Sequence, residues 1–282
     1  MKGTFTKFFL MRFVMISFLL FFFFGHTEAQ NAEALIKAEK AFEQSCLKLG
    51  IRDGFLAWVD PGGIEFTEKG PANAKQLWTS YPSFEGIFSW APTYAEMSIS
   101  GDWGYTTGNY EHRPKSLQDS VDEAGQYTTV WHKNNIGEWK YLVDIGNKHA
   151  PVAPEKMANT ILATKFKATH YTDSAGLADL ERLFIGLFEK DVRDAYLKFG
   201  SSHYILNLPQ HEMVTGTDRA MLLIQSFPSL PLYHVSGIFV SPGGDMAAVY
   251  GSIGESAKKA SYLRIWRFEK NGWKIALEVI RI

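Results

Sequence analysis

Apolar residues recur at helical spacing near the start of the chain, and segments that alternate between apolar and polar residues follow them. Leu35, Phe42 and Cys46 mark one face of a first helix, and residues 55–59 predict a second, short helix. The stretch "NAKQLWTSY" predicts a further helix. Strands are expected near 93–99, 104–113, 126–133 and 139–146.

The second half of the chain shows the same plan. Asp173 or Ser174 can cap a helix whose apolar face includes Leu177, Phe184 and Phe188. Strands are expected near 233–240, 246–253, 261–268 and 273–281. Helices followed by a run of antiparallel strands predict an α+β fold, with the helices on one face of a curved sheet.

The two halves also match in their residues. "TVWHKNNIGEWKYLVDIG" (129–146) aligns with "LRIWRFEKNGWKIALEVI" (263–280), which pairs Trp131 with Trp266 and Asp144 with Glu278. Shorter matches, such as "IRDGFLAW" with "VRDAYLKF", occur in the same order in both halves. Two copies of one domain explain this pattern most simply. The expected domains are 31–150 and 173–282, joined by a proline-containing linker over 151–172.

The N-terminus has the layout of a secretory signal peptide. Lys2, Lys7 and Arg12 flank an apolar block, and Ala29 is a small residue at a suitable cleavage position. The alternative is a membrane anchor, but the block is shorter than the ~20 residues that a spanning helix needs. We therefore expect residues 1–29 to be removed, leaving a periplasmic or secreted protein that is not held in a membrane.

Composition excludes several classes of function. The chain has 282 residues, 46% of them hydrophobic, and a formal net charge of −1, so it has no basic surface for nucleic acid. The single cysteine, Cys46, allows no internal disulfide and is expected to be a small buried residue. The sequence shows no zinc-type histidine spacing, no nucleophile elbow and no phosphate-binding glycine loop, so neither a metal nor a cofactor is expected.

Four short motifs carry a resemblance to a known family: "GDWGYTTGNYE" (101–111), "GQYTTVW" (125–131), "GEWK" (137–140) and "DIGNKH" (144–149). With these motifs the chain resembles the nuclear-transport-factor-2-like (NTF2-like, SnoaL-like) superfamily, which includes ketosteroid isomerases, polyketide cyclases and limonene epoxide hydrolases. The first half is most similar to a bacterial branch of it, the domain of unknown function 4440. The resemblance is clear over about 33–150 and weaker over 174–282. It implies two cones, each a strongly curved antiparallel sheet around N-terminal helices, which could pair as an internal pseudo-dimer.

The resemblance also implies which residues line the cavity of the cone. It places Leu142 and Asp144 beside cavity positions, with Glu278 in the same place in the second copy. A carboxyl group in an apolar cavity has a raised pKa and can act as an acid or a base near neutral pH. The alternative is that Asp144 forms an ion pair with Lys140, Arg113 or His132, or faces solvent.

Steroid isomerase chemistry does not fit these residues. That reaction uses an Asp base together with a Tyr and a protonated Asp. By resemblance the base position falls on Phe66, and the protonated-acid position falls on Thr129 in the first copy and Arg264 in the second. Glu65 has the wrong strand parity to replace the base directly.

Further candidates for ligand contact are large or polar residues on the expected strands and helices. They are Trp58, Tyr105, Glu111, Gln126, Thr129, Trp131, Leu142 and His149. For the tryptophans the alternative is a role in the core, and for His149 it is an exposed loop. The second copy has small or charged residues at several matching positions, which indicates a degenerate site.

Two functions remain open from the sequence. In the first, the first domain binds a small, mostly apolar molecule. In the second, the protein is a cofactor-independent cyclase, dehydratase or isomerase in which Asp144 transfers a proton.

Overall fold

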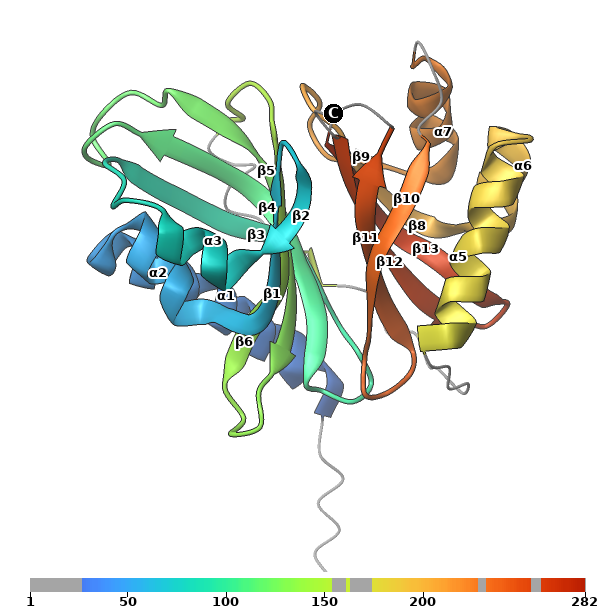
Figure 1. The fold of residues 1–282 in the computed structure, drawn as a ribbon, viewed down its shortest axis with the longest axis horizontal. Coiled ribbons are helices and arrows are strands. Elements are labelled where there is room, and N and C mark those ends of the chain that lie inside the picture. The colour runs from blue at the N-terminus through green and yellow to red at the C-terminus, as the bar shows by residue number, and fades with distance from the viewer. Residues whose placement is uncertain (1–26, 154–160, 163–173, 228–231, 255–259, 282) are drawn as a thin grey trace, which may run out of the picture.

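The computed structural model describes residues 27–153, 161–162, 174–227, 232–254 and 260–281. This part of the chain forms two units, each a bent sheet with its own helices (Figure 1). The two sheets face each other in the middle of the molecule, and the helices of each unit lie on its outer side. Most of the expected signal peptide lies outside the described residues. Within those residues, no helix is both long and apolar enough to cross a membrane.

The first unit begins with a long helix and ends with a meander of strands. Its elements are α1 (Thr27–Leu49), α2 (Ile51–Trp58), β1 (Val59–Thr67), β2 (Gly70–Asn73), α3 (Ala74–Ser80), β3 (Ile87–Met97), β4 (Trp103–Arg113), β5 (Glu123–Lys133) and β6 (Trp139–Lys148). A two-residue strand, β7 (Ile161–Leu162), pairs with β3. It belongs to the stretch expected to be a linker.

The second unit follows the same sequence of elements. They are α5 (Ser174–Phe188), α6 (Val192–Phe199), β8 (Gly200–Asn207), β9 (Val214–Thr215), α7 (Thr217–Gln225), β10 (Tyr233–Val240), β11 (Met246–Ile253), β12 (Ala260–Glu269) and β13 (Gly272–Arg281). The strand order is β9-β8-β13-β12-β11-β10, which matches the order β2-β1-β6-β5-β4-β3 of the first unit. The predicted fold class, two α+β units with curved sheets and N-terminal helices, is confirmed.

One detail of the predicted sheet is wrong, because each sheet contains a parallel pair, β1 with β6 and β8 with β13. A helix was expected through Val59, yet the helix ends at Trp58 and strand β1 begins at Val59. The strand was hidden by its Asp-Pro-Gly-Gly start, which reads as a turn. Gly63 is needed here, since a Cβ would lie 2.8 Å from Val59 Cγ2 and 3.2 Å from the Tyr141 carbonyl oxygen.

The register of the last two strands is the same in both units. Thr129 lies opposite Asp144, as Arg264 lies opposite Glu278. In both units a β-bulge follows on the next residues, between Val130 and Trp131 and at the matching place in β12. The alignment of the two halves made from sequence therefore describes structurally equivalent positions.

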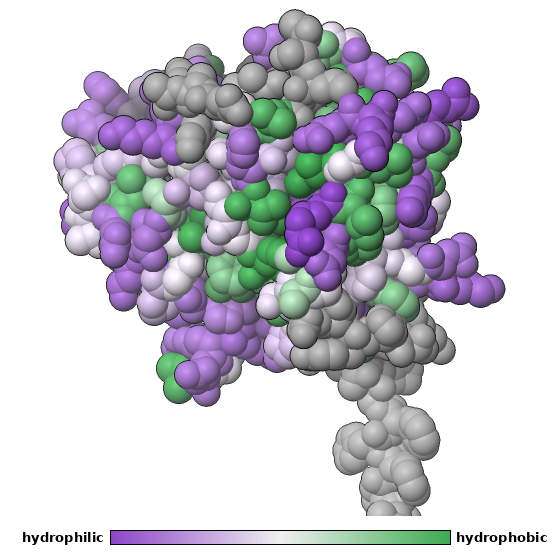
Figure 2. All heavy atoms as spheres, turned by 45° about the vertical axis from the view of Figure 1, so that its right-hand side comes forward, coloured by the Kyte–Doolittle hydropathy of each residue, from purple (hydrophilic) through white to green (hydrophobic). Residues whose placement is uncertain are grey.

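The two sheets pack directly against each other. Their facing sides share one buried apolar cluster, to which Val143 of the first unit and Leu277 of the second contribute. Buried polar contacts add to it: Arg267 Nη1 donates to Glu96 Oε2 at 2.6 Å. The outer surface is mixed, and Figure 2 shows hydrophobic residues gathered in the middle of one face with hydrophilic residues around them.

Candidate functional site

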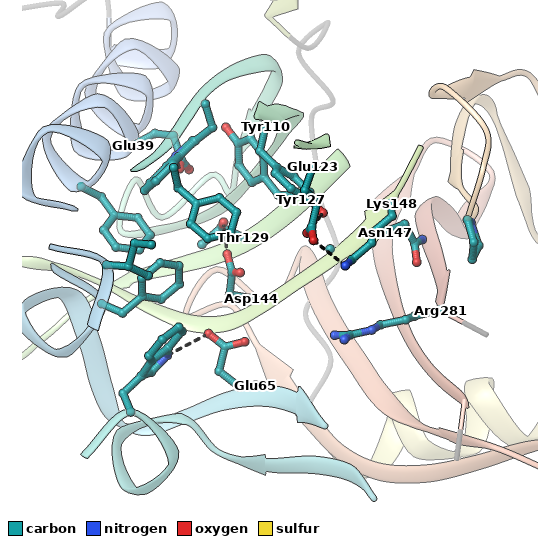
Figure 3. Close-up of a pocket in the computed structure, with 18 residues that line it drawn as sticks. Glu39, Glu65, Tyr110, Glu123, Tyr127, Thr129, Asp144, Asn147, Lys148 and Arg281 are labelled. Carbon is teal, nitrogen blue, oxygen red and sulfur yellow. Dashed lines mark hydrogen bonds and ion pairs between the residues drawn. The ribbon is translucent and has the colours of Figure 1, made fainter. Parts of the chain in front are cut away.

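A cavity of about 420 Å³ lies between the helices and the sheet of the first unit (Figure 3). Aromatic rings supply most of its apolar wall: Phe42, Phe55, Trp78, Phe88, Trp90, Tyr110 and Tyr127. Four carboxyl groups line it: Glu39, Glu65 and Asp144 project into its interior from three different elements, and Glu123 lies near Lys148. The second unit reaches the rim through Pro209 and Arg281.

The aromatic rings hold one another in place by edge-on and tilted contacts. Phe42 on α1 lies 4.8 Å from Phe55 and 5.0 Å from Trp90, between ring centroids. Phe55 in turn lies 4.3 Å from Trp78. Aromatic pairs at such distances stabilise a fixed arrangement beyond the burial of their area. The wall of the cavity is therefore preformed in the absence of a ligand.

Asp144 enters the cavity from β6, as the resemblance implied. Its Oδ2 accepts a hydrogen bond of 2.6 Å from the hydroxyl of Thr129 on β5. Removal from water raises the pKa of Asp144 from 3.8 to about 6, while the Thr129 hydroxyl and the charge of Arg281 hold it from rising further. The alternative partners contact other residues: Lys140 donates to the Ala57 carbonyl oxygen, Arg113 pairs with Glu111, and His132 lies beside Asp60.

Glu39 is fully buried on α1 and closes the far side of the cavity. Its carboxylate accepts the indole N–H of Trp90 at 2.6 Å and that of Trp131 at 3.0 Å, and it also accepts the Thr106 hydroxyl. Burial raises its pKa from 4.5 to about 7, and the nearby charge of Asp144 adds to the rise. Glu39 was not among the residues expected at the site. Its signal in the sequence is an acid on an apolar helix face.

Glu65 is the third acid, and here the parity argument from the sequence was wrong. Glu65 faces the cavity, where Trp78 Nε1 donates to it at 3.2 Å, and Phe66 instead packs in the cluster between the sheets. Burial, followed by the charge of Asp144, raises the pKa of Glu65 well above its usual value. The hydroxyl of Tyr141 also points at it, 3.4 Å away.

Positive charge lies only at the rim of the cavity among the residues that line it. Arg281 donates to the Phe66 carbonyl oxygen at 3.2 Å. Its positive charge partly opposes the rise that burial causes in the pKa of Asp144 and of Glu65. Lys148 forms an ion pair with Glu123. Figure 3 shows the three acids deeper in the cavity than these two cations.

The other expected site residues divide between the cavity wall and the opposite face of the sheet. Thr129 lines the cavity. Trp131 and Trp58 stand behind it, with Trp131 donating to Glu39 and Trp58 lying 5.9 Å from both Trp131 and Phe42. These tryptophans support the wall rather than line it.

Tyr105 and Leu142 face the second unit instead of the cavity. Both belong to the apolar cluster between the sheets, and the Tyr105 hydroxyl donates to Glu96 at 2.7 Å. Leu142 is the extra residue of the β-bulge in β6, so it lies on the same side as Val143. A bulge of this kind reverses strand parity, which is why Leu142 does not share the cavity face with Asp144 as the resemblance implied.

Three remaining candidates also lie away from the cavity. Glu111 pairs with Arg113 at 2.6 Å. Gln126 is buried and shares its strand parity with Thr128, which contacts the second unit. His149 lines a separate hollow, together with residues of the second unit.

In the second unit, Arg264 fills the place that corresponds to the cavity. Its guanidinium is fully buried and bonds to Glu181 and, at 2.5 Å, to Glu278. The Phe184 ring lies 4.2 Å and the Tyr233 ring 4.6 Å from its Cζ. An internal cation thus neutralises the acids of the second unit.

Within the described part of the chain, no group of three or more His, Cys, Asp or Glu side chains could hold a metal ion. What the cavity offers chemically is an aromatic wall, hydrogen-bond acceptors and three acids with raised pKa values, of which Asp144 and Glu39 can gain or lose protons near neutral pH.

Comparison with known proteins gives a likeness of architecture. No family model matches the chain, and no curated protein matches it. Among solved structures, an NTF2-like protein from Cytophaga hutchinsonii is 16% identical, covers 38% of this chain and 95% of its own, and has a TM-score of 0.32. An NTF2-like protein of unknown function from Silicibacter pomeroyi has 16% identity, 38% and 93% coverage and a TM-score of 0.31. For a ketosteroid isomerase-like protein from Erwinia carotovora these values are 16%, 38%, 92% and 0.30. Each of these three matches covers about the length of one unit.

Proposed function

We propose that this protein is an exported NTF2-like protein that binds a small, mostly apolar molecule in the cavity of its first unit. We further propose that it consists of two tandem copies of the domain of unknown function 4440 type, the second of which has lost its site. The observation that carries the proposal is the preformed cavity of about 420 Å³ with its aromatic wall.

The size and the lining of the cavity suit a small organic ligand. Ligand sites in proteins usually enclose about 300–1,000 Å³ and combine an apolar wall with a few polar groups. The rings of Phe55, Trp78 and Trp90 supply the wall, and Asp144 and Glu65 are polar groups that can fix the orientation of a ligand. The second unit closes the rim, so both units contribute to the site.

A binding screen tests the proposal directly. Hydrophobic metabolites should include compounds that raise the melting temperature of the protein and change its tryptophan fluorescence, because Trp78 and Trp90 line the cavity. For such a compound, Phe55→Ala should weaken binding about tenfold, since a buried ring contributes about 1.5–3 kcal/mol and part of it faces the ligand.

The matched control is Leu56→Ala, on the same helix but outside the cavity lining. It should leave the affinity within about twofold. A screen without a single compound that binds, or equal losses in Phe55→Ala and Leu56→Ala, would contradict the proposal.

A second candidate function, an acid–base enzyme without a cofactor, is favoured by one observation. Asp144 and Glu39 share the cavity and have pKa values of about 6 and about 7, where proton transfer at neutral pH is efficient. If a bound compound is converted, Asp144→Asn should lower kcat about 100-fold or more while binding persists. Unchanged turnover in Asp144→Asn would remove this candidate and leave the binding protein.

A further inference from the structure

We propose that the ligand of the first unit carries a cationic group, such as an amidinium, guanidinium or ammonium, which occupies the place that the Arg264 guanidinium takes in the second unit. This inference rests on the proposed binding function and specifies the class of ligand. The two units surround that place with equivalent residues, and only the second unit supplies the cation itself.

The first equivalent pair is Glu39 and Glu181. Glu39 accepts the indole N–H of Trp131 at 3.0 Å, and Glu181 accepts that of Trp266 at 2.7 Å. The two tryptophans occupy the same position beside the β-bulge in their strands. Both acids are fully buried on the first helix of their units.

The second equivalent pair is Asp144 and Glu278, on the last strand of each unit. The residue opposite Asp144 is Thr129, and the residue opposite Glu278 is Arg264. Arg264 reaches both acids of its unit. Thr129 is short and uncharged, and its hydroxyl reaches Asp144 alone.

The aromatic surroundings correspond as well. The helix spacing that relates Glu39 to Phe42 relates Glu181 to Phe184, and the Phe184 ring lies 4.2 Å from the Arg264 Cζ. In the sheets, Tyr127 on β5 occupies the position that Tyr262 occupies on β12, because the pairing of β5 with β4 has the same register as the pairing of β12 with β11. In the second unit these faces attract a cation. The first unit retains the rings and has open space between them.

The charges of the first unit favour a cation from outside. Three acids face the interior of the cavity from α1, β1 and β6. A fourth lining acid, Glu123, pairs with Lys148 at the rim, and Arg281 lies there in contact with the Phe66 carbonyl oxygen. Burial raises the pKa of Glu39 to about 7 and that of Asp144 to about 6, so both acids hold their protons to a higher pH than exposed acids do. A bound cation would favour their ionised forms and so release protons. The apolar remainder of the ligand would lie against Phe55 and Trp78.

A series of three probes of similar shape tests the inference. They are benzamidine, benzamide and benzoate, which carry a positive charge, no charge and a negative charge. We expect calorimetry at pH 7 to show benzamidine binding at least about tenfold more tightly than the other two. Its affinity should rise between pH 5.5 and 7.5, and titrations in two buffers should show that protons are released on binding.

The outcomes separate this inference from the binding function. If benzamide or benzoate binds as tightly as benzamidine, the cationic ligand is wrong and the cavity remains a binding site. The same conclusion holds if none of the three binds at millimolar concentration while other compounds from the hydrophobic screen do. If no compound of either set binds, both proposals are wrong.

Two variants test whether the acids of the cavity cause the preference for benzamidine. In the double variant Glu39→Gln, Asp144→Asn, the neutral amides should reduce the preference for benzamidine over benzamide to about one. Thr129→Arg should supply the cation from within the chain, abolish benzamidine binding and raise the melting temperature relative to Thr129→Met, which adds bulk without charge. A double variant that keeps the full preference, or a Thr129→Arg protein no more stable than Thr129→Met, would overturn the inference.

Discussion

Arg264→Met is expected to destabilise the protein by about 3–5 kcal/mol in the free energy of unfolding, the largest loss that we predict for a single substitution. The guanidinium is fully buried between Glu181 and Glu278, which are themselves fully buried. Methionine fills much of the same volume but leaves both acids without their counter-ion. An unpaired buried charge must then be protonated or hydrated at the expense of the folded state. Urea unfolding at pH 7 measures the loss.

The control for this prediction is an arginine on the surface of the same unit. Arg182 pairs with Asp179, and their side chains are 71% and 65% exposed. Arg182→Met should change the free energy of unfolding by no more than about 0.5 kcal/mol. The triple variant Arg264→Met, Glu181→Gln, Glu278→Gln should be more stable than Arg264→Met alone. A loss below about 1 kcal/mol in Arg264→Met would show that this cluster is not the buried ion network described above.

The second large effect is a loss of stability as the pH rises, caused by Glu39. Its pKa is raised from 4.5 to about 7 in the folded protein, so between these values the folded state binds more protons than the unfolded state. Its contribution to stability is complete below about pH 4.5 and is lost as the pH rises through 7. The shift corresponds to roughly 3 kcal/mol. Asp144, with a pKa of about 6, acts in the same direction.

Glu39→Gln isolates this effect, because glutamine is neutral at every pH and its carbonyl oxygen can still accept an indole N–H. The difference in unfolding free energy between the wild type and Glu39→Gln should fall by roughly 3 kcal/mol from pH 4.5 to pH 8. Glu33→Gln, at an exposed position of the same helix, should follow the wild-type profile. A difference that stays constant with pH would show that Glu39 is not a buried acid with a raised pKa.

Much of the fold was predictable because its signals are local. The helical period of Leu35, Phe42 and Cys46 and the alternation of the later strands follow from which side chains are buried on one face. The sequence was less informative where the chain meets a distant segment. Strand β1 begins with turn-forming residues, and its pairing with β6 depends on the whole unit being folded around it.

The candidate site was predictable only in part. The resemblance placed Asp144 in the cavity, and Thr129 was a candidate for ligand contact; both line the cavity. Leu142 was misplaced because one bulge reverses the alternation of β6. Glu65 was set aside for a similar reason, since the parity of an unrecognised strand cannot be judged from the sequence.

By itself the sequence determined that one helix-and-sheet plan occurs twice, and that an acid, Asp144 or Glu278, lies near the end of the last strand of each copy. Periodicity and internal similarity are properties of the chain, so they can be read without coordinates. Only the tertiary structure decided that Glu39, Glu65 and Asp144 meet in one cavity, and that Arg264 fills the corresponding place in the second unit. The physical reason is that residues far apart in the sequence meet only in the folded protein. Their packing decides which space stays open, and their burial and charges decide the pKa values of the acids in it.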